Sequence, residues 1–306
     1  MEFEIIIDDR FMKMNSDESL IRIDRKHVLS LANDFEDGNW RFKKFQNFIW
    51  DNIAETALTF RERQSLSTKA QSMLSEAAQK LRLVSDADEI GRGSEIAEIV
   101  LYGIMKHHFK ALPVVPKIYF KQNVNDNAKG ADSVHIVVTG DQDFTVWFGE
   151  AKFYNSIENV RLGKIVKSVN AMLETKKLKK ENSIILGVSD LDLVIESAAL
   201  SEQIRSLLSS QESIDSLKPY LHIPILLLHE CEITTNSNMM TSEYKDSLRK
   251  HHEERAMSYF KKQIALLGDE INMYDEISFH LIFFPVPNKA LIVEKFIKLA
   301  EGYKAE

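Results

Sequence analysis

Residues 144–153 read FTVWFGEAKF, and this stretch decides the fold prediction. Aromatic and β-branched residues dominate it, which is typical of a strand. Because successive side chains of a strand alternate between its faces, Glu150 and Lys152 share one face and Ala151 points the other way. That arrangement leaves the backbone carbonyl of Ala151 free beside the two charged side chains. We therefore expect a carboxylate, a carbonyl and an ammonium group to meet at one place on a sheet.

A second carboxylate comes from the preceding predicted strand, residues 130–138, which contains Asp132 and ends at the turn-forming residues 139–141. Antiparallel neighbours run in opposite senses, so an acid early in one strand and an acid late in the next reach the same end of the sheet. Hard cations prefer oxygen ligands. We expect Mg²⁺ or Mn²⁺ to be bound by Asp132, Glu150 and the carbonyl of Ala151.

A third source of acid lies upstream, in a predicted helix with Ser94 as its N-cap. Glu95 and Glu98 are three residues apart and so share one helical face. An acid in a first turn commonly complements the helix dipole, which is the favoured interpretation of Glu95. Glu98 lies deeper in the helix and is the better candidate for an auxiliary catalytic acid and metal ligand, although either could serve.

A basic, amphipathic helix is predicted for residues 156–180, directly after the Glu-x-Lys strand. Arg161, Lys164 and Lys167 lie in its first turns, where they could contact phosphates of a nucleic acid close to the metal. The four lysines at its end complement a helix C-terminus whatever the function.

The order of these elements over residues 91–190 resembles the PD-(D/E)XK nuclease superfamily, although Ala131 stands where the family name has proline. The resemblance implies that Asp132 and Glu150 bind one or two Mg²⁺ ions and that Lys152 orients or deprotonates the attacking water. The segment GEAKFY, residues 149–154, which follows a helix containing EIVLY, residues 98–102, is similar to the corresponding sequence of the HamA family, the nuclease subunits of Hachiman-type bacterial anti-phage systems. That likeness implies a superfamily 2 helicase subunit, HamB-like, as partner.

A lone Glu-x-Lys on a strand is usually a solvated ion pair, so the prediction depends on context. Here the preceding aspartate, the acidic helix before it and the basic helix after it occur in the order that a nuclease needs. The net charge of −7 argues against a non-specific DNA binder that acts alone, so we expect a partner. The alternatives are a catalytically inactive nucleic-acid-binding module and an interaction subunit whose acids only stabilise the sheet.

The chain is predicted to have an α/β fold, with a mixed central sheet flanked by helices. Residues 1–90 are interpreted as a mainly helical N-terminal interaction region, and residues 91–306 as a restriction-endonuclease-like nuclease domain. Aromatic residues at helical spacing in the N-terminal region indicate core or a protein interface, and an exposed aromatic surface there would suit the helicase. Further helices are predicted at 39–64, 68–83, 196–209, 243–267 and 289–302, and further strands at 3–7, 184–188, 223–228 and 277–284.

The remaining features exclude several classes of protein. No apolar stretch is long enough for a membrane span and the first residues lack the basic start of a secretory signal, so we expect a cytoplasmic protein. The single cysteine, Cys231, excludes an intrachain disulfide and is interpreted as a small residue at a strand end. The pairs His107-His108 and His251-His252 lack the i, i+4 partner of a zinc-binding helix and are predicted to lie at the surface. Residues 234–241 are predicted to form a mobile loop.

Overall fold

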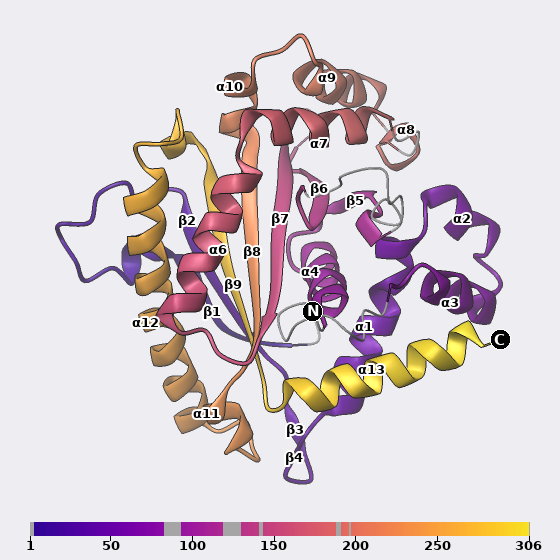
Figure 1. Ribbon diagram of the computed structural model, residues 1–306, viewed down its shortest axis with the longest axis vertical. Coiled ribbons are helices and arrows are strands. Elements are labelled where there is room, and N and C mark those ends of the chain that lie inside the picture. Colours follow the sequence, from indigo (N-terminus) through magenta and orange to yellow (C-terminus); the bar gives the residue numbers. More distant parts are fainter. Residues whose placement is uncertain are drawn as a thin grey trace.

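The computed structural model describes residues 3–82, 93–118, 130–140, 143–187, 191–195 and 197–305. A seven-stranded sheet forms the middle layer, in the order β1-β2-β9-β8-β7-β6-β5, and helices cover both of its faces (Figure 1). Its strands are β1 (Glu4–Arg10), β2 (Lys26–Ala32), β5 (Leu112–Val115), β6 (Ser133–Val138), β7 (Phe144–Tyr154), β8 (Leu221–Glu230) and β9 (Ser278–Val286). The prediction of a mixed sheet flanked by helices is confirmed.

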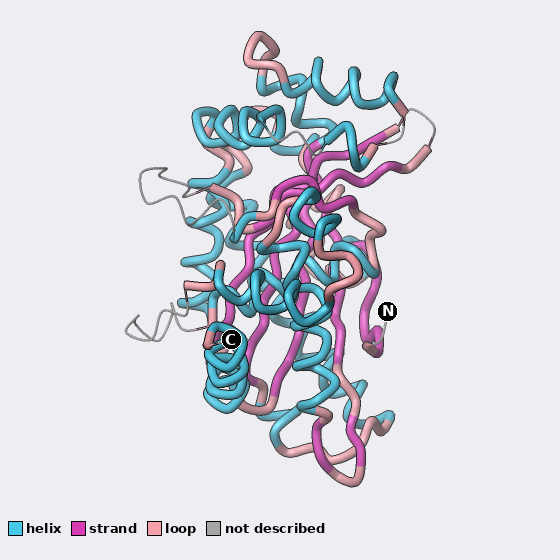
Figure 2. Tube along the Cα trace, turned by 90° about the vertical axis from the view of Figure 1, so that its right-hand side faces the viewer, coloured by secondary structure: helices cyan, strands magenta, loops and turns pink. Residues whose placement is uncertain are grey.

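The sheet is parallel at its centre and antiparallel at its edges. Strands β7, β8, β9 and β2 run parallel, whereas β1 pairs antiparallel with β2, and β6 antiparallel with both β7 and β5. The long strands run side by side with helices packed over them (Figure 2). A separate short hairpin, β3 (Phe35–Glu36) with β4 (Asn39–Trp40), projects at one end. Central parallel strands are buried on both faces, which explains the continuous apolar run of β8.

The helices of the described residues divide between the two faces of the sheet. They are α1 (Phe42–Ala57), α2 (Phe60–Ser65), α3 (Ala70–Gln79), α4 (Ser94–His107), α6 (Asn159–Met172), α7 (Thr175–Gly187), α8 (Leu191–Val194), α9 (Ala198–Leu208), α10 (Ile214–Leu217), α11 (Glu232–Thr235), α12 (Ser242–Leu267) and α13 (Lys289–Lys304). On β7, Phe148 packs in one apolar cluster with residues of α6 and α12, whereas Ala151 packs in a second cluster with residues of α1, α4 and α13. By strand alternation, Glu150 and Lys152 lie on the face covered by α6 and α12.

Several predicted element boundaries are wrong. Instead of the strand predicted at 184–188, residues 184–187 form the end of α7, and the buried face of this helix includes Leu178 and Ile185. Val188 lies outside the described residues. A short apolar run fits a buried helix as well as a strand. The helix predicted at 156–180 is two helices, α6 and α7, and the one predicted at 39–64 is β4, α1 and α2. The predicted loop 234–241 begins inside α11.

The described residues of the N-terminal region, 3–82, share the sheet and the core with the rest of the described chain. Strand β2 pairs with β9, and α1 packs against α4. The aromatic side chains of α1 are core residues: Phe45 is 0% and Phe48 4% exposed. Of the two interpretations of these aromatics, core is therefore confirmed for Phe45 and Phe48, and the expectation that they form an exposed interface is wrong. The predicted boundary at residue 90 lies outside the described residues.

Candidate active site

Strand β7 continues beyond the point where its partner β6 begins, and this offset creates the site. The ladder between them ends at the pair Ser133 and Gly149, while β7 runs on to Tyr154. Asp132, the residue before β6, lies at the point where the two strands separate, which we call the fork. Its backbone N–H donates to the carbonyl of Gly149 at 2.7 Å, and its Oδ2 accepts from the backbone N–H of Ala151 at 3.0 Å. Asp132 therefore satisfies backbone groups of β7 that the ladder leaves unpaired.

The ammonium group of Lys152 lies among three oxygen atoms in this fork. Its Nζ is 2.5 Å from Oε1 of Glu150 and 3.3 Å from Oδ2 of Asp132. The carbonyl oxygen of Ala151 is 3.2 Å from the same nitrogen. Three oxygens that converge on one cationic atom form the all-oxygen donor set that Mg²⁺ prefers. The residues present therefore fit a hard divalent cation. The ammonium group of Lys152 already lies among these oxygens, so positive charge is favourable at this place.

Burial and charge shift the pKa values within this cluster in opposing ways. The Glu150 side chain is 4% exposed, and this burial, together with the charge of Asp132, raises its pKa, against the effects of Lys152 and Ser168. Burial also opposes the charged form of Lys152, but the two carboxylates outweigh it and raise the pKa of the ammonium group. Lys152 thus holds its proton while both acids are its neighbours.

Ser168, on α6, contacts the site and carries no sequence signal. Its hydroxyl donates to Oε1 of Glu150 at 2.5 Å, across the packing of α6 on the sheet. An isolated serine on an amphipathic helix has no local pattern that distinguishes it from a solvated one. The contact becomes visible only once α6 is placed over β7.

The three predicted phosphate-binding residues all lie on α6, and the structure brings one of them next to β7. The guanidinium group of Arg161 lies 5.2 Å from the ring centre of Tyr154, two residues beyond Lys152. Lys164 and Lys167 are exposed on the same helix. Their contact with nucleic acid stays a prediction.

The predicted auxiliary acids lie on α4, the helix that packs on the other face of the sheet. Glu95 accepts a hydrogen bond from the backbone N–H of Arg82 at 2.8 Å, and Glu98 is buried at 5% exposure one turn before Tyr102. Tyr102 donates from its hydroxyl to the carbonyl of Val115. The role of either acid in the site stays a prediction.

The start of α4 differs from the predicted cap. Its N-cap is Gly93, and Ser94 is the first helical residue. Gly93 has φ +82°, and a Cβ there would lie 2.9 Å from Val293 and 3.0 Å from Phe153. Only glycine tolerates both the positive φ and this close approach to β7.

A buried ion pair holds the segment that leads into Asp132. Glu181 on α7 accepts from Nζ of Lys117 at 2.9 and 2.7 Å, and both side chains are almost fully buried. The same carboxylate accepts from the backbone N–H of Ala131 at 3.0 Å. A Cβ on Gly130 would lie 1.8 Å from Glu181, so glycine is needed for this approach. Glu181 therefore positions the backbone next to Asp132.

The four histidines predicted to lie at the surface are more enclosed than expected. His252 is completely buried, and His107, His108 and His251 are partly buried. An adjacent pair on a helix necessarily directs its two side chains apart, so one of them faces the sheet when the helix packs. For the pair on α12, that one is His252.

A comparison with protein families finds that the family model described as HamA matches residues 9–300 of the 306. The match covers the whole sheet from the end of β1 and includes Asp132, Glu150 and Lys152. No curated protein matches the chain. Within the described parts of the chain, the helices are too short or too polar to cross a bilayer.

Proposed function

Because the chain belongs to the HamA family, a component of Hachiman anti-phage defence, we propose that it is the metal-dependent nuclease of that system and that it cleaves DNA. The observation that carries the proposal is the convergence of Asp132, Glu150 and the Ala151 carbonyl on the ammonium group of Lys152. Acid pairs with a lysine at a strand end supply the groups needed for phosphodiester hydrolysis.

In this proposal the two carboxylates and the carbonyl would hold Mg²⁺ or Mn²⁺. When bound, such an ion polarises a phosphate and lowers the pKa of water, which is the chemistry that phosphodiester hydrolysis needs. Asp132 and Glu150 also orient Lys152, whose N–H groups can hold the attacking water or a phosphate oxygen. Since both carboxylates raise the pKa of Lys152, the lysine stays protonated beside them and acts as a hydrogen-bond donor; a bound cation would share their charge and lower that pKa.

The proposed substrate approach runs along α6. Arg161, packed over Tyr154, would bind a phosphate next to the site, and exposed Lys164 and Lys167 would extend that contact. These local cations act against a net charge of −7, so affinity for DNA would be weak without help. A superfamily 2 helicase that delivers single- or double-stranded DNA would supply it.

The deciding experiment is degradation of plasmid and single-stranded DNA, with an RNA of the same length in parallel. We expect cleavage with Mg²⁺ or Mn²⁺, none in a chelator, and little with Ca²⁺, which prefers looser coordination. Glu150→Gln should be inactive under every condition. Equal degradation in a chelator, or by Glu150→Gln, would show that another activity is being measured.

One observation favours the alternative of an inactive module: Lys152 already pairs with both acids, as a structural ion cluster would. The same assay decides between them. DNA binding without cleavage under all metals would support the inactive module, and neither binding nor cleavage would support an interaction subunit.

The proposed helicase partner is tested with the full chain, because residues 1–90 supply β1 and β2 to the sheet and their deletion would disrupt the core. After co-expression with the proposed superfamily 2 helicase subunit, we expect the two proteins to elute together in size-exclusion chromatography. Separate elution at micromolar concentrations would contradict the partnership while leaving the nuclease proposal intact.

A further inference from the structure

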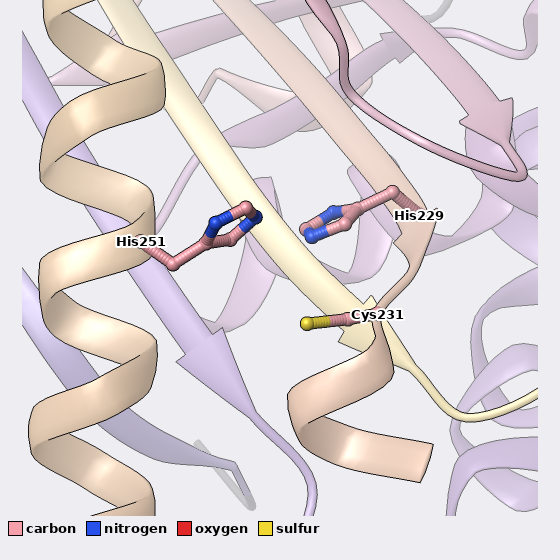
Figure 3. A group of neighbouring side chains, drawn as sticks. All are labelled: His229, Cys231 and His251. Carbon is pink, nitrogen blue, oxygen red and sulfur yellow. The ribbon is translucent and has the colours of Figure 1, made fainter.

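A second cluster of potential ligands lies at the end of β8, apart from the carboxylates. It contains His229 near the end of β8, Cys231 directly after that strand, and His251 from α12 (Figure 3). The potential ligand atoms of these three side chains all lie within 4.8 Å of one another. His229 and Cys231 are buried, whereas His251 is partly exposed.

Local backbone geometry explains how the three side chains meet. Cys231 has extended backbone angles, φ −139° and ψ 119°, so its side chain points to the same face of the chain as that of His229, two residues before. Helix α12 packs across this face and brings His251 over the strand end (Figure 3). The ligands are therefore drawn from two rigid elements.

The hydrogen bonds of His229 fix which of its nitrogens is available. Nδ1 lies 3.0 Å from the carbonyl oxygen of Leu227, which can only accept, so Nδ1 carries the proton and Nε2 presents a lone pair. A histidine that donates one N–H to a backbone carbonyl and offers its other nitrogen is the usual arrangement of a metal ligand.

His252, the neighbour of His251, secures α12 in this position. Its Nδ1 is 2.7 Å from Oγ of Ser30 on β2, and its ring stacks on Phe283 of β9 with centroids 4.6 Å apart. Its Nε2 contacts Nε2 of His229 at 3.4 Å, a long hydrogen bond. A metal–nitrogen bond would replace this long contact, and Nδ1 of His252 would keep its contact with Ser30.

We propose that His229, Cys231 and His251 form a binding site for a transition-metal ion of the zinc class, with a fourth position open to solvent beside His251. Two imidazoles and one thiolate suit Zn²⁺, whereas the oxygen-only set at Asp132 and Glu150 suits Mg²⁺. Ligand atoms of a tetrahedral zinc site lie roughly 3.5 Å apart, given bonds of about 2.0–2.3 Å. The 4.8 Å within which the three ligand atoms lie is an upper limit, and side-chain rotations could bring them to the spacing of a bound ion.

The position of the site would let a bound ion link two elements of the fold. His229 pairs in register with Tyr154 of β7, two residues beyond Lys152, and on the same face of the sheet. An ion bound there would tie α12 to the end of β8, next to the carboxylate cluster. The inference does not depend on nuclease activity, because it concerns binding and stability.

The test uses Co²⁺ as the probe, added to the metal-free, full-length chain. We expect one equivalent to give the visible bands of tetrahedral cobalt and a thiolate-to-metal charge-transfer band. Cys231 is the only cysteine of the chain, so the second band has a single source. Cys231→Ser should lose the charge-transfer band, and His251→Gln should lose the tetrahedral spectrum.

Two controls locate the ion. His107→Gln removes a histidine of similar burial on α4 and should leave both bands unchanged, as should Glu150→Gln, which removes a carboxylate of the other cluster. Zn²⁺ should raise the Tm of the unmodified chain and not that of His251→Gln, whose folding is checked by circular dichroism. A folded chain without the charge-transfer band, or a band that survives Cys231→Ser, would overturn the proposal.

Discussion

At the scale of single residues, Glu150 is buried and has both an anionic neighbour, Asp132, and a cationic neighbour, Lys152. Replacing it with glutamine removes the charge that we propose binds the metal ion, while Lys152 keeps Asp132 as its partner. We predict that Glu150→Gln lowers cleavage by more than the roughly 100-fold seen for residues that only support a metal ligand. The Tm should hardly change, because a buried charge is lost without a cavity.

Glu174→Gln, at an exposed position after α6, is the matched control and should cleave like the unmodified chain. Plasmid cleavage and thermal unfolding are measured for both variants. If Glu150→Gln unfolded the chain, the acid would be structural; if it cleaved normally, the proposed site would be wrong.

Ser168 provides a more selective test, since it acts through Glu150. Its hydrogen bond favours the charged carboxylate, so Ser168→Ala should raise the pKa of Glu150 further. We predict that activity falls about 10-fold and that the acidic limb of the pH–rate profile moves to higher pH. Ser168→Thr, which retains a hydroxyl, should restore most of both. A lower rate with an unmoved profile would assign Ser168 to packing alone.

At the scale of elements, the Lys117–Glu181 pair links α7 to the segments that flank β5 and β6. Removing one partner of a buried pair leaves the other charge buried, at a cost of about 3–5 kcal/mol. We predict losses of this size for Glu181→Leu and for Lys117→Met in urea unfolding. The double variant should lose clearly less than the sum, because neither charge remains.

The double variant also separates stability from positioning. It still lacks the carboxylate that holds the N–H of Ala131 next to Asp132, so its cleavage should stay low even where it is folded. Losses that simply add would show that the two side chains do not stabilise each other.

At the scale of the whole molecule, buried histidines should control the stability in acid. Burial lowers the pKa of His222 and His229 to about 4, and that of His252 and His280 well below the usual value of 6.5. The unfolded chain therefore binds more protons than the folded chain below pH 6.5. The stabilising contribution of these neutral histidines is fully present above pH 6.5 and is lost as the pH falls towards 4.

We predict that the free energy of unfolding in a chelator is lower at pH 5 than at pH 7.5. The contribution of a buried histidine such as His229 is on the order of 2 kcal/mol at pH 5. Urea titrations at the two pH values measure the difference, and His229→Gln should reduce it if the variant folds. Equal stability at both values would show that these histidines do not become buried in the neutral form.

The sequence alone predicted the family, the mixed sheet flanked by helices, and the grouping of Asp132, Glu150 and Lys152. These predictions depend on motifs and on residue patterns within single elements or between neighbouring ones. Strand alternation places Glu150 beside Lys152, and the neighbouring antiparallel strand places Asp132 against them; both follow from residues close in the chain. The apolar runs of β8 and β9 are equally local. The nuclease role of the cluster itself stays a prediction.

Tertiary structure alone decided which distant residues meet. The attachment of β2 to β9, the helical state of residues 184–187 and the burial of the α1 aromatics all depend on strand order and helix packing, which periodicity does not encode. For the same reason Ser168, Glu181 and the His229–Cys231–His251 cluster have no signature along the chain. Local sequence determined the type of most elements, though not of the end of α7, and the face that each one offers. The packing of those faces against each other determined which side chains touch.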